Sequence, residues 1–226
     1  MLYYLFEYLE SQFNLPGASV FQFITFRAAL AFMFSLLFST IFGKKIINFL
    51  RKQQVGETVR DLGLEGQAQK SGTPTMGGII IILATLIPVL LLAKLDNIYV
   101  VILLITTVWM GFIGFVDDYI KVFKKDKGGL SGKFKVLGQV GLGLIVGSML
   151  YFHPDVVIKE QLPTDQQVVQ KNGRKQVFGD AHKSTKTTIP FLKDNELDYS
   201  KPLSFLGDGY EKYAWIIFIF VVVFIV

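Results

Sequence analysis

The feature that most constrains this chain is a series of apolar blocks, each close to the length of a membrane-crossing helix. Five blocks are predicted as spans: residues 21–42, 76–93, 98–116, 136–152 and 214–226. A helix needs about 20 mostly apolar residues to cross a bilayer, so the first four are predicted as complete spans. The fold class expected is an all-α integral membrane protein, built as a polytopic helical bundle.

The fifth block is too short to span. Its 13 residues would rise about 20 Å, against a hydrocarbon core of about 30 Å. We therefore expect an N-terminal fragment: one transmembrane domain over residues 1–226, truncated at its C-terminus, with an extracytoplasmic insert at residues 153–213. Within that insert, Asn172-Gly173 between two apolar runs predicts a β-hairpin.

Basic residues give the expected orientation. Residues 43–75 and 117–135 each contain six Lys or Arg, which predicts that both segments are cytoplasmic and that the N-terminus is outside. Because the basic residues flank apolar blocks, the net charge of +5 reflects orientation and no nucleic-acid partner is expected. The absence of cysteine excludes disulfides and thiolate metal sites.

Two carboxylates stand at the end of the third span. If that helix continues, Asp117 lies one turn from Lys121, while Asp118 is three residues from the same lysine. Adjacent anions at a helix C-terminus are disfavoured by the helix dipole and by mutual repulsion, so a functional role is favoured over an ordinary interfacial charge. Paired carboxylates at a membrane surface suit Mg²⁺ binding or proton removal.

A second segment precedes the second span. Thr73 and Pro74 read as an N-cap followed by proline at the first helical position, so free N–H groups would face the cytoplasmic interface. Such a helix start attracts anions, with Lys70 and the Thr75 hydroxyl adding a charge and a donor. The alternative is a well-capped helix whose glycines pack against a neighbour.

A third segment, residues 124–135, is basic and rich in glycine. It either sets orientation and attracts anionic headgroups, or folds back and brings Lys133 towards the carboxylates. Together the three segments imply a polyanionic, phosphate-bearing ligand and a membrane-lipid partner.

These motifs also resemble a known family. Residues 72–78 (GTPTMGG) after a basic residue, residues 117–121 (DDYIK), then Gly129-Leu130 and Lys133, are similar to phospho-N-acetylmuramoyl-pentapeptide transferase, in the polyprenyl-phosphate N-acetylhexosamine-1-phosphate transferase superfamily. The resemblance implies a ten-helix enzyme of the bacterial inner membrane, often a homodimer. It would transfer phospho-MurNAc-pentapeptide from UDP-MurNAc-pentapeptide to undecaprenyl phosphate with Mg²⁺, forming lipid I and releasing UMP.

The resemblance assigns roles by position. It implies that Asp117 and Asp118 are the catalytic and metal-binding pair and that Lys121 is the lysine beside them. It also implies that the nucleotide-sugar pocket is lined by Lys70, Thr75 and Lys133. The family's third aspartate and histidine-rich loop belong to later helices, so the fragment by itself is expected to be inactive. His153 and His182 are expected to be surface residues that do not replace that loop.

The mechanism expected is direct attack by the lipid phosphate on the sugar-linked phosphorus, with Asp117 accepting any remaining proton and Asp118 holding the metal or orienting Lys121. A covalent aspartyl-phosphate route is the alternative. The rival functions are a sister GlcNAc-1-phosphate transferase and a transporter. The spans contain no Asp or Glu near their midplanes, which argues against the transporter.

Overall fold

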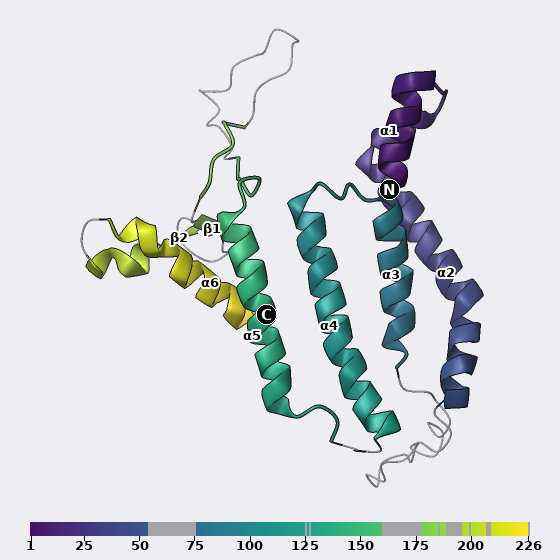
Figure 1. Ribbon diagram of the computed structural model, residues 1–226. Coiled ribbons are helices and arrows are strands. Elements are labelled where there is room, and N and C mark those ends of the chain that lie inside the picture. The colour runs from purple at the N-terminus through teal and green to yellow at the C-terminus, as the bar shows by residue number, and fades with distance from the viewer. Residues whose placement is uncertain are drawn as a thin grey trace. The chain divides into compact units, whose positions relative to one another are not determined.

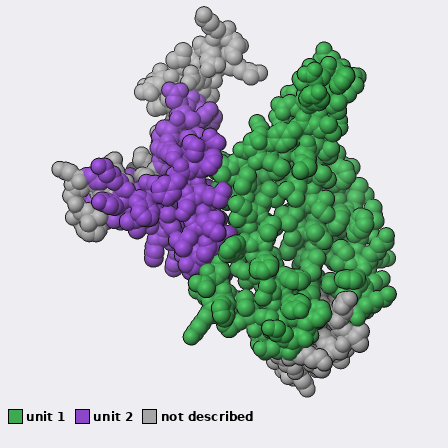
Figure 2. Space-filling model, viewed as in Figure 1, with its two compact units in different colours: residues 1–138 green, residues 139–226 purple. Residues whose placement is uncertain are grey.

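In the computed structural model, the described part of the chain forms helices and one small pair of strands (Figure 1). The structure describes residues 1–53, 76–124, 126, 128–159, 178–184, 186–188, 196–198, 200–206 and 209–225. Contacts group the chain into two compact units, residues 1–138 and 139–226 (Figure 2). The expected single domain with an insert at residues 153–213 stays a prediction.

The first unit is helical. In chain order its elements are α1 (Leu2–Phe13), η1 (Ala18–Gln22), α2 (Ile24–Gln53), α3 (Gly78–Leu92), α4 (Ile98–Phe123) and the start of α5 (Gly132–Phe152). α3 packs between α2 and α4 (Figure 1). A short turn joins α3 to α4, and the Asn97 side chain caps α4 by accepting a hydrogen bond from Tyr99 N at 2.9 Å. The two helices are antiparallel, so α3 begins at the end of the unit where α4 finishes.

Among the described residues, three helices, α2, α4 and α5, are long and apolar enough to cross a membrane. Their surfaces are apolar and exposed, as at Phe32 and Leu103, which is the pattern of helices in lipid. The polytopic membrane fold is therefore confirmed. The predicted count of four complete spans is not confirmed, because α3 has only 15 described helical residues.

The predicted start of α3 is wrong. Thr73 and Pro74 signal a helix beginning at residue 74, but Met76 has φ 67°, a left-handed conformation that an α-helix cannot contain. The helix therefore begins at Gly78, with Gly77 as its N-cap. Met76 itself is buried, with 6% of its surface exposed.

The second unit holds the rest of α5 and a short sheet. β1 (Lys186–Thr188) pairs antiparallel with β2 (Glu196–Asp198), and Thr187 faces Leu197 in the register. Two 3₁₀ helices, η4 (Lys201–Leu206) and η5 (Tyr210–Tyr213), lead into α6 (Ala214–Ile225). The hairpin predicted around Asn172-Gly173 lies outside the described residues.

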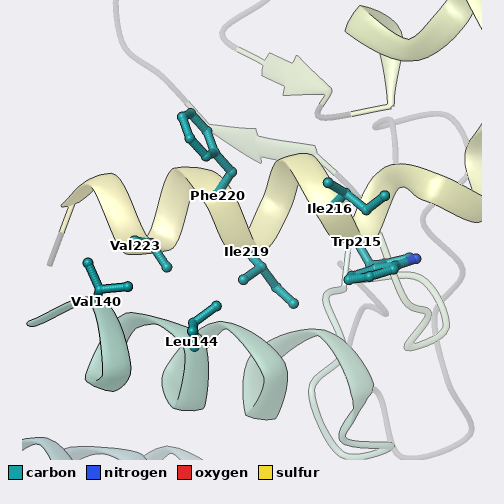
Figure 3. Close-up of a pocket in the computed structure, with 7 residues that line it drawn as sticks. All are labelled: Val140, Leu144, Trp215, Ile216, Ile219, Phe220 and Val223. Carbon is teal, nitrogen blue, oxygen red and sulfur yellow. The ribbon is translucent and has the colours of Figure 1, made fainter. Parts of the chain in front are cut away.

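Glycines allow α5 and α6 to approach closely. A Cβ placed on Gly143 would lie 2.7 Å from the Cα atom of Val223, and one on Gly147 would lie 3.3 Å from the Cα atom of Ile219. The two glycines form a small-xxx-small pair, the arrangement that lets helix backbones pack closely. Beside the contact lies an apolar groove of about 300 Å³ (Figure 3), lined by Val140, Leu144, Trp215, Ile216, Ile219, Phe220 and Val223. None of these side chains is charged, so the groove offers no phosphate-binding cation.

Candidate active site

The two aspartates lie on the last turns of α4, which runs on to Phe123. Lys121 Nζ is 2.5 Å from Asp117 Oδ2 and 4.0 Å from Asp118 Oδ1. This geometry confirms the prediction that the helix continues past residue 116 and that one lysine reaches both carboxylates. The nearer contact is the i, i+4 pair, as helical spacing requires.

The segment after α4 turns back over Asp117. The Asp126 side chain accepts a hydrogen bond from Gly128 N at 2.9 Å, and its carbonyl accepts one from Gly129 N at 3.1 Å. Gly129 has φ +67°, and the chain then presents Leu130 N to Asp117 Oδ1 at 2.8 Å. The glycine-rich segment therefore folds back onto Asp117, as in the second of its two predicted arrangements, but that arrangement also placed Lys133 near the carboxylates.

A second lysine comes from the first turn of α5. Lys135 Nζ lies 2.9 Å from Asp117 Oδ1. The Ser131 carbonyl accepts hydrogen bonds from the backbone N–H groups of Phe134 and Lys135, which starts the helix in this orientation.

Lys133 does not take the position expected from the sequence. It is exposed and makes no ion pair with any residue that the structure describes. Residues two apart on a helix point about 200° apart, so Lys133 and Lys135 cannot both face α4. Which of the two lysines faces α4 depends on the residue at which α5 begins. The pattern of basic residues alone does not reveal that residue.

The two carboxylates differ in their surroundings. The Asp117 side chain is 14% exposed and accepts from Lys121, Lys135 and Leu130 N. The Asp118 side chain is 34% exposed and, within the described part of the chain, its nearest charged partner is Lys121 at 4.0 Å. Two ammonium groups offset the repulsion between adjacent anions and the unfavourable helix dipole. Asp117 is thus fully engaged, while Asp118 remains available to a ligand.

Mg²⁺ is usually held by one or two carboxylates together with substrate phosphates. The described residues contain no group of three His, Cys, Asp or Glu side chains that could enclose a metal. The partly exposed Asp118 fits a site in which one carboxylate holds the ion and substrate phosphates supply other oxygens. His153 and His182 belong to the second unit, where His153 contacts Asp155 and His182 pairs through its backbone with Ile158.

The other predicted site residues, Lys70 and Thr75, lie outside the described residues. Their segment leads into α3, whose start shares an end of the first unit with the aspartates. The predicted placement of both motifs on one face of the membrane is consistent with this antiparallel arrangement.

Gly129 is predicted to be essential for the fold of this loop. A Cβ there would lie 2.5 Å from Asp117 Oδ1 and 2.7 Å from Lys121 Cε, in a left-handed backbone that costs about 1–2 kcal/mol for other residues. We expect Gly129→Ala to lower any activity that depends on this site about tenfold or more. Gly132→Ala is the matched control, because a Cβ at Gly132 meets nothing within 4 Å. Equal activity of the two variants in an initial-rate assay would contradict the proposed loop geometry.

Comparison with known proteins points to one family. Residues 70–82 match the model described as phospho-N-acetylmuramoyl-pentapeptide-transferase signature 1. The chain is similar over its whole length to proteins named phospho-N-acetylmuramoyl-pentapeptide-transferase: 63% identical to that of Flavobacterium psychrophilum, 62% to that of Flavobacterium johnsoniae and 56% to that of Parabacteroides distasonis. It spans 56%, 56% and 53% of the lengths of these relatives.

Proposed function

This chain belongs to the phospho-N-acetylmuramoyl-pentapeptide transferase family, and from that premise we propose an activity for the full-length protein, meaning this chain continued to the length of its relatives. The full-length protein transfers phospho-MurNAc-pentapeptide from UDP-MurNAc-pentapeptide to undecaprenyl phosphate, forming lipid I and releasing UMP. The observation that carries this proposal is the engagement of Asp117 by Lys121, Lys135 and Leu130 N at the end of a membrane helix. The chain alone, lacking about half of that length, is proposed to be inactive.

The reaction needs positioning and charge stabilisation more than covalent chemistry by the protein. An oxygen of the lipid phosphate bonds to the sugar-linked phosphorus while the bond from that phosphorus to the UMP oxygen breaks. Two anions must approach each other, so ammonium groups beside the reacting phosphates stabilise the charge that develops. Lys121 stands between the two carboxylates and is placed to contribute in this way.

The contacts favour roles for Asp117 and Asp118 that differ from those expected from the sequence. Asp117 accepts from three donors, so we assign it the positioning of both lysines and of the Leu130 loop. Asp118, whose nearest cation in the described part of the structure is Lys121 at 4.0 Å, is assigned proton acceptance and metal binding. The covalent aspartyl-phosphate route would need a nucleophile free of partners, and Asp117 does not meet that requirement.

Mg²⁺ is proposed as the cofactor, with Asp118 as its ligand from this chain. When bound, the ion would supply positive charge that neutralises the reacting phosphates. Lys70, Thr75 and Lys133 are proposed to bind the nucleotide sugar. We further propose that α3 and α6 also cross the bacterial inner membrane, that the site faces the cytoplasm with the N-terminus outside, and that the full-length protein is a homodimer.

Substitutions of the two lysines of α5 should produce different kinetic defects. We expect Lys133→Gln to raise KM for UDP-MurNAc-pentapeptide about tenfold with little change in kcat, because it removes a charge that binds substrate. Lys135→Gln should lower kcat about tenfold with little change in KM, because that lysine acts through Asp117. Initial rates of the full-length variants over a substrate series give both constants. The reverse pattern would contradict the assignment.

The proposed function is tested by supplying the full-length protein with undecaprenyl phosphate and either UDP-MurNAc-pentapeptide or UDP-GlcNAc. Lipid-linked MurNAc-pentapeptide and UMP are the products expected. A lipid product from UDP-GlcNAc alone would favour the sister transferase. Solute flux into proteoliposomes with no lipid-linked product would favour the transporter.

A further inference from the structure

A second group of charges lies at the other end of the first unit. Lys94 follows α3, and Arg27 lies near the beginning of α2. From the cap of α4 at Asn97 to Asp117 is 20 residues of helix, or about 30 Å, which matches the thickness of the hydrocarbon core. The charged group around Arg27 and the aspartates therefore lie at opposite membrane surfaces.

Arg27 and Lys94 both lie against the ring of Tyr3 in α1. The guanidinium carbon of Arg27 lies 4.6 Å from the centre of the Tyr3 ring, and Lys94 Nζ lies 5.7 Å from the same centre. Tyr4 holds this arrangement in place, since its hydroxyl accepts a hydrogen bond from Asp96 N at 3.1 Å. The Tyr3 ring thus links α1 to two basic residues that are 67 positions apart in the chain.

Arg27 is short of hydrogen-bond acceptors. Its Nε and Nη1 atoms are buried and have no partner among the described residues. No carboxylate of the described residues lies within ion-pair distance of Arg27 or Lys94. A buried guanidinium donor without an acceptor is costly, so this arrangement calls for an anion with several oxygens.

The acidic residues nearby, Glu7 and Asp96, do not form ion pairs with Arg27 or Lys94. The Glu7 carboxylate accepts from the Tyr3 hydroxyl at 3.4 Å, at the edge of the ring and not at its face. Asp96 contributes its backbone N–H to Tyr4, and its side chain is exposed. Both carboxylates remain directed to solvent or to a neutral hydroxyl.

The surroundings are those of a bilayer interface. Phe6 stacks on Phe21 with ring centres 3.8 Å apart, and Phe21 meets Phe26 edge to face at 5.2 Å. Beside them stand Tyr3 and Tyr4, and tyrosine gathers at the level of lipid headgroups. Arginine binds phosphate through two parallel N–H groups.

We propose that Arg27, Lys94 and the Tyr3 ring form a binding site for the phosphate group of an anionic phospholipid, at the membrane surface opposite the aspartates. The site holds α1 and the beginning of α2 against the end of α3. It does not depend on the transferase chemistry, and it would persist in a protein of this fold with a different activity.

The test uses the full-length protein in nanodiscs of phosphatidylcholine with one-third phosphatidylglycerol, released into native mass spectrometry. We expect Arg27→Gln and Lys94→Gln to retain about fivefold less phosphatidylglycerol than the wild type. Arg51→Gln is the matched control, since it removes the same charge from the far end of α2, and it should retain the wild-type amount.

Further variants and a competition with inorganic phosphate distinguish the possible outcomes. Should Arg27→Gln fail to fold, Lys94→Gln and Arg27→Lys carry the test, with Arg27→Lys expected to lose retention through its missing second N–H pair. Displacement of the lipid by about 10 mM inorganic phosphate would show a soluble anion as the ligand and overturn the lipid assignment. Undiminished phosphatidylglycerol retention in Arg27→Gln and Lys94→Gln would overturn the site itself.

Discussion

Replacing Asp117 by Asn is expected to lower kcat of the full-length protein on the order of 100- to 1,000-fold. The amide removes the charge that holds Lys121 and Lys135, which lie 2.5 Å and 2.9 Å from the carboxylate oxygens. It retains one oxygen, so the hydrogen bond from Leu130 N can persist. The KM for UDP-MurNAc-pentapeptide and the Mg²⁺ requirement should change little, because Asp117 acts through its lysines.

Asp126→Asn is the matched control for this result. It removes a carboxylate from the same loop, while an asparagine oxygen can still accept from Gly128 N. We expect the control to keep its activity within about threefold of the wild type. An Asp117→Asn variant that retains more than half of the wild-type kcat would contradict the proposed role of Asp117.

Replacing Asp118 by Asn should produce a different defect. Because Asp118 is the freer carboxylate and is proposed to bind Mg²⁺, its loss should raise the Mg²⁺ concentration for half-maximal activity about tenfold or more. At saturating Mg²⁺, kcat should still be lower by on the order of 100-fold, since the proton acceptor is also lost.

The two aspartate variants are compared in one Mg²⁺ titration. Added Mg²⁺ should recover part of the activity of Asp118→Asn and none of that of Asp117→Asn. Binding of Mn²⁺ to the purified protein, followed by its electron spin resonance signal, gives a readout that does not depend on turnover. Unchanged Mn²⁺ affinity in Asp118→Asn would remove that residue from the metal site.

Much of the site could be predicted because it depends on local helical geometry. A four-residue spacing on a continuing helix is enough to bring Lys121 to Asp117, and the observed 2.5 Å contact confirms it. The apolar blocks likewise predicted the membrane helices, since length and hydropathy decide whether a segment can cross a bilayer.

The remaining features depend on contacts between segments. Lys135 replaces Lys133 beside the aspartate because α5 begins at Gly132, and that boundary follows from the turn at Gly129. The start of α3 differs from the prediction because the left-handed backbone of Met76 overrides a strong Thr-Pro capping signal. The sequence does not reveal the proposed lipid site because Tyr3, Arg27 and Lys94 share no motif, and only the packing of α1 brings them together.

The central claim is that Asp117 and Lys135 act as one unit, so that the end of α4 and the beginning of α5 form a single preorganised site. A double-mutant cycle on kcat with Asp117→Asn, Lys135→Gln and the double variant tests it directly. We predict that Lys135→Gln lowers kcat about tenfold in the wild type and has almost no further effect once Asp117 is Asn. An equal loss in both backgrounds would show that the two side chains act independently and would contradict the claim.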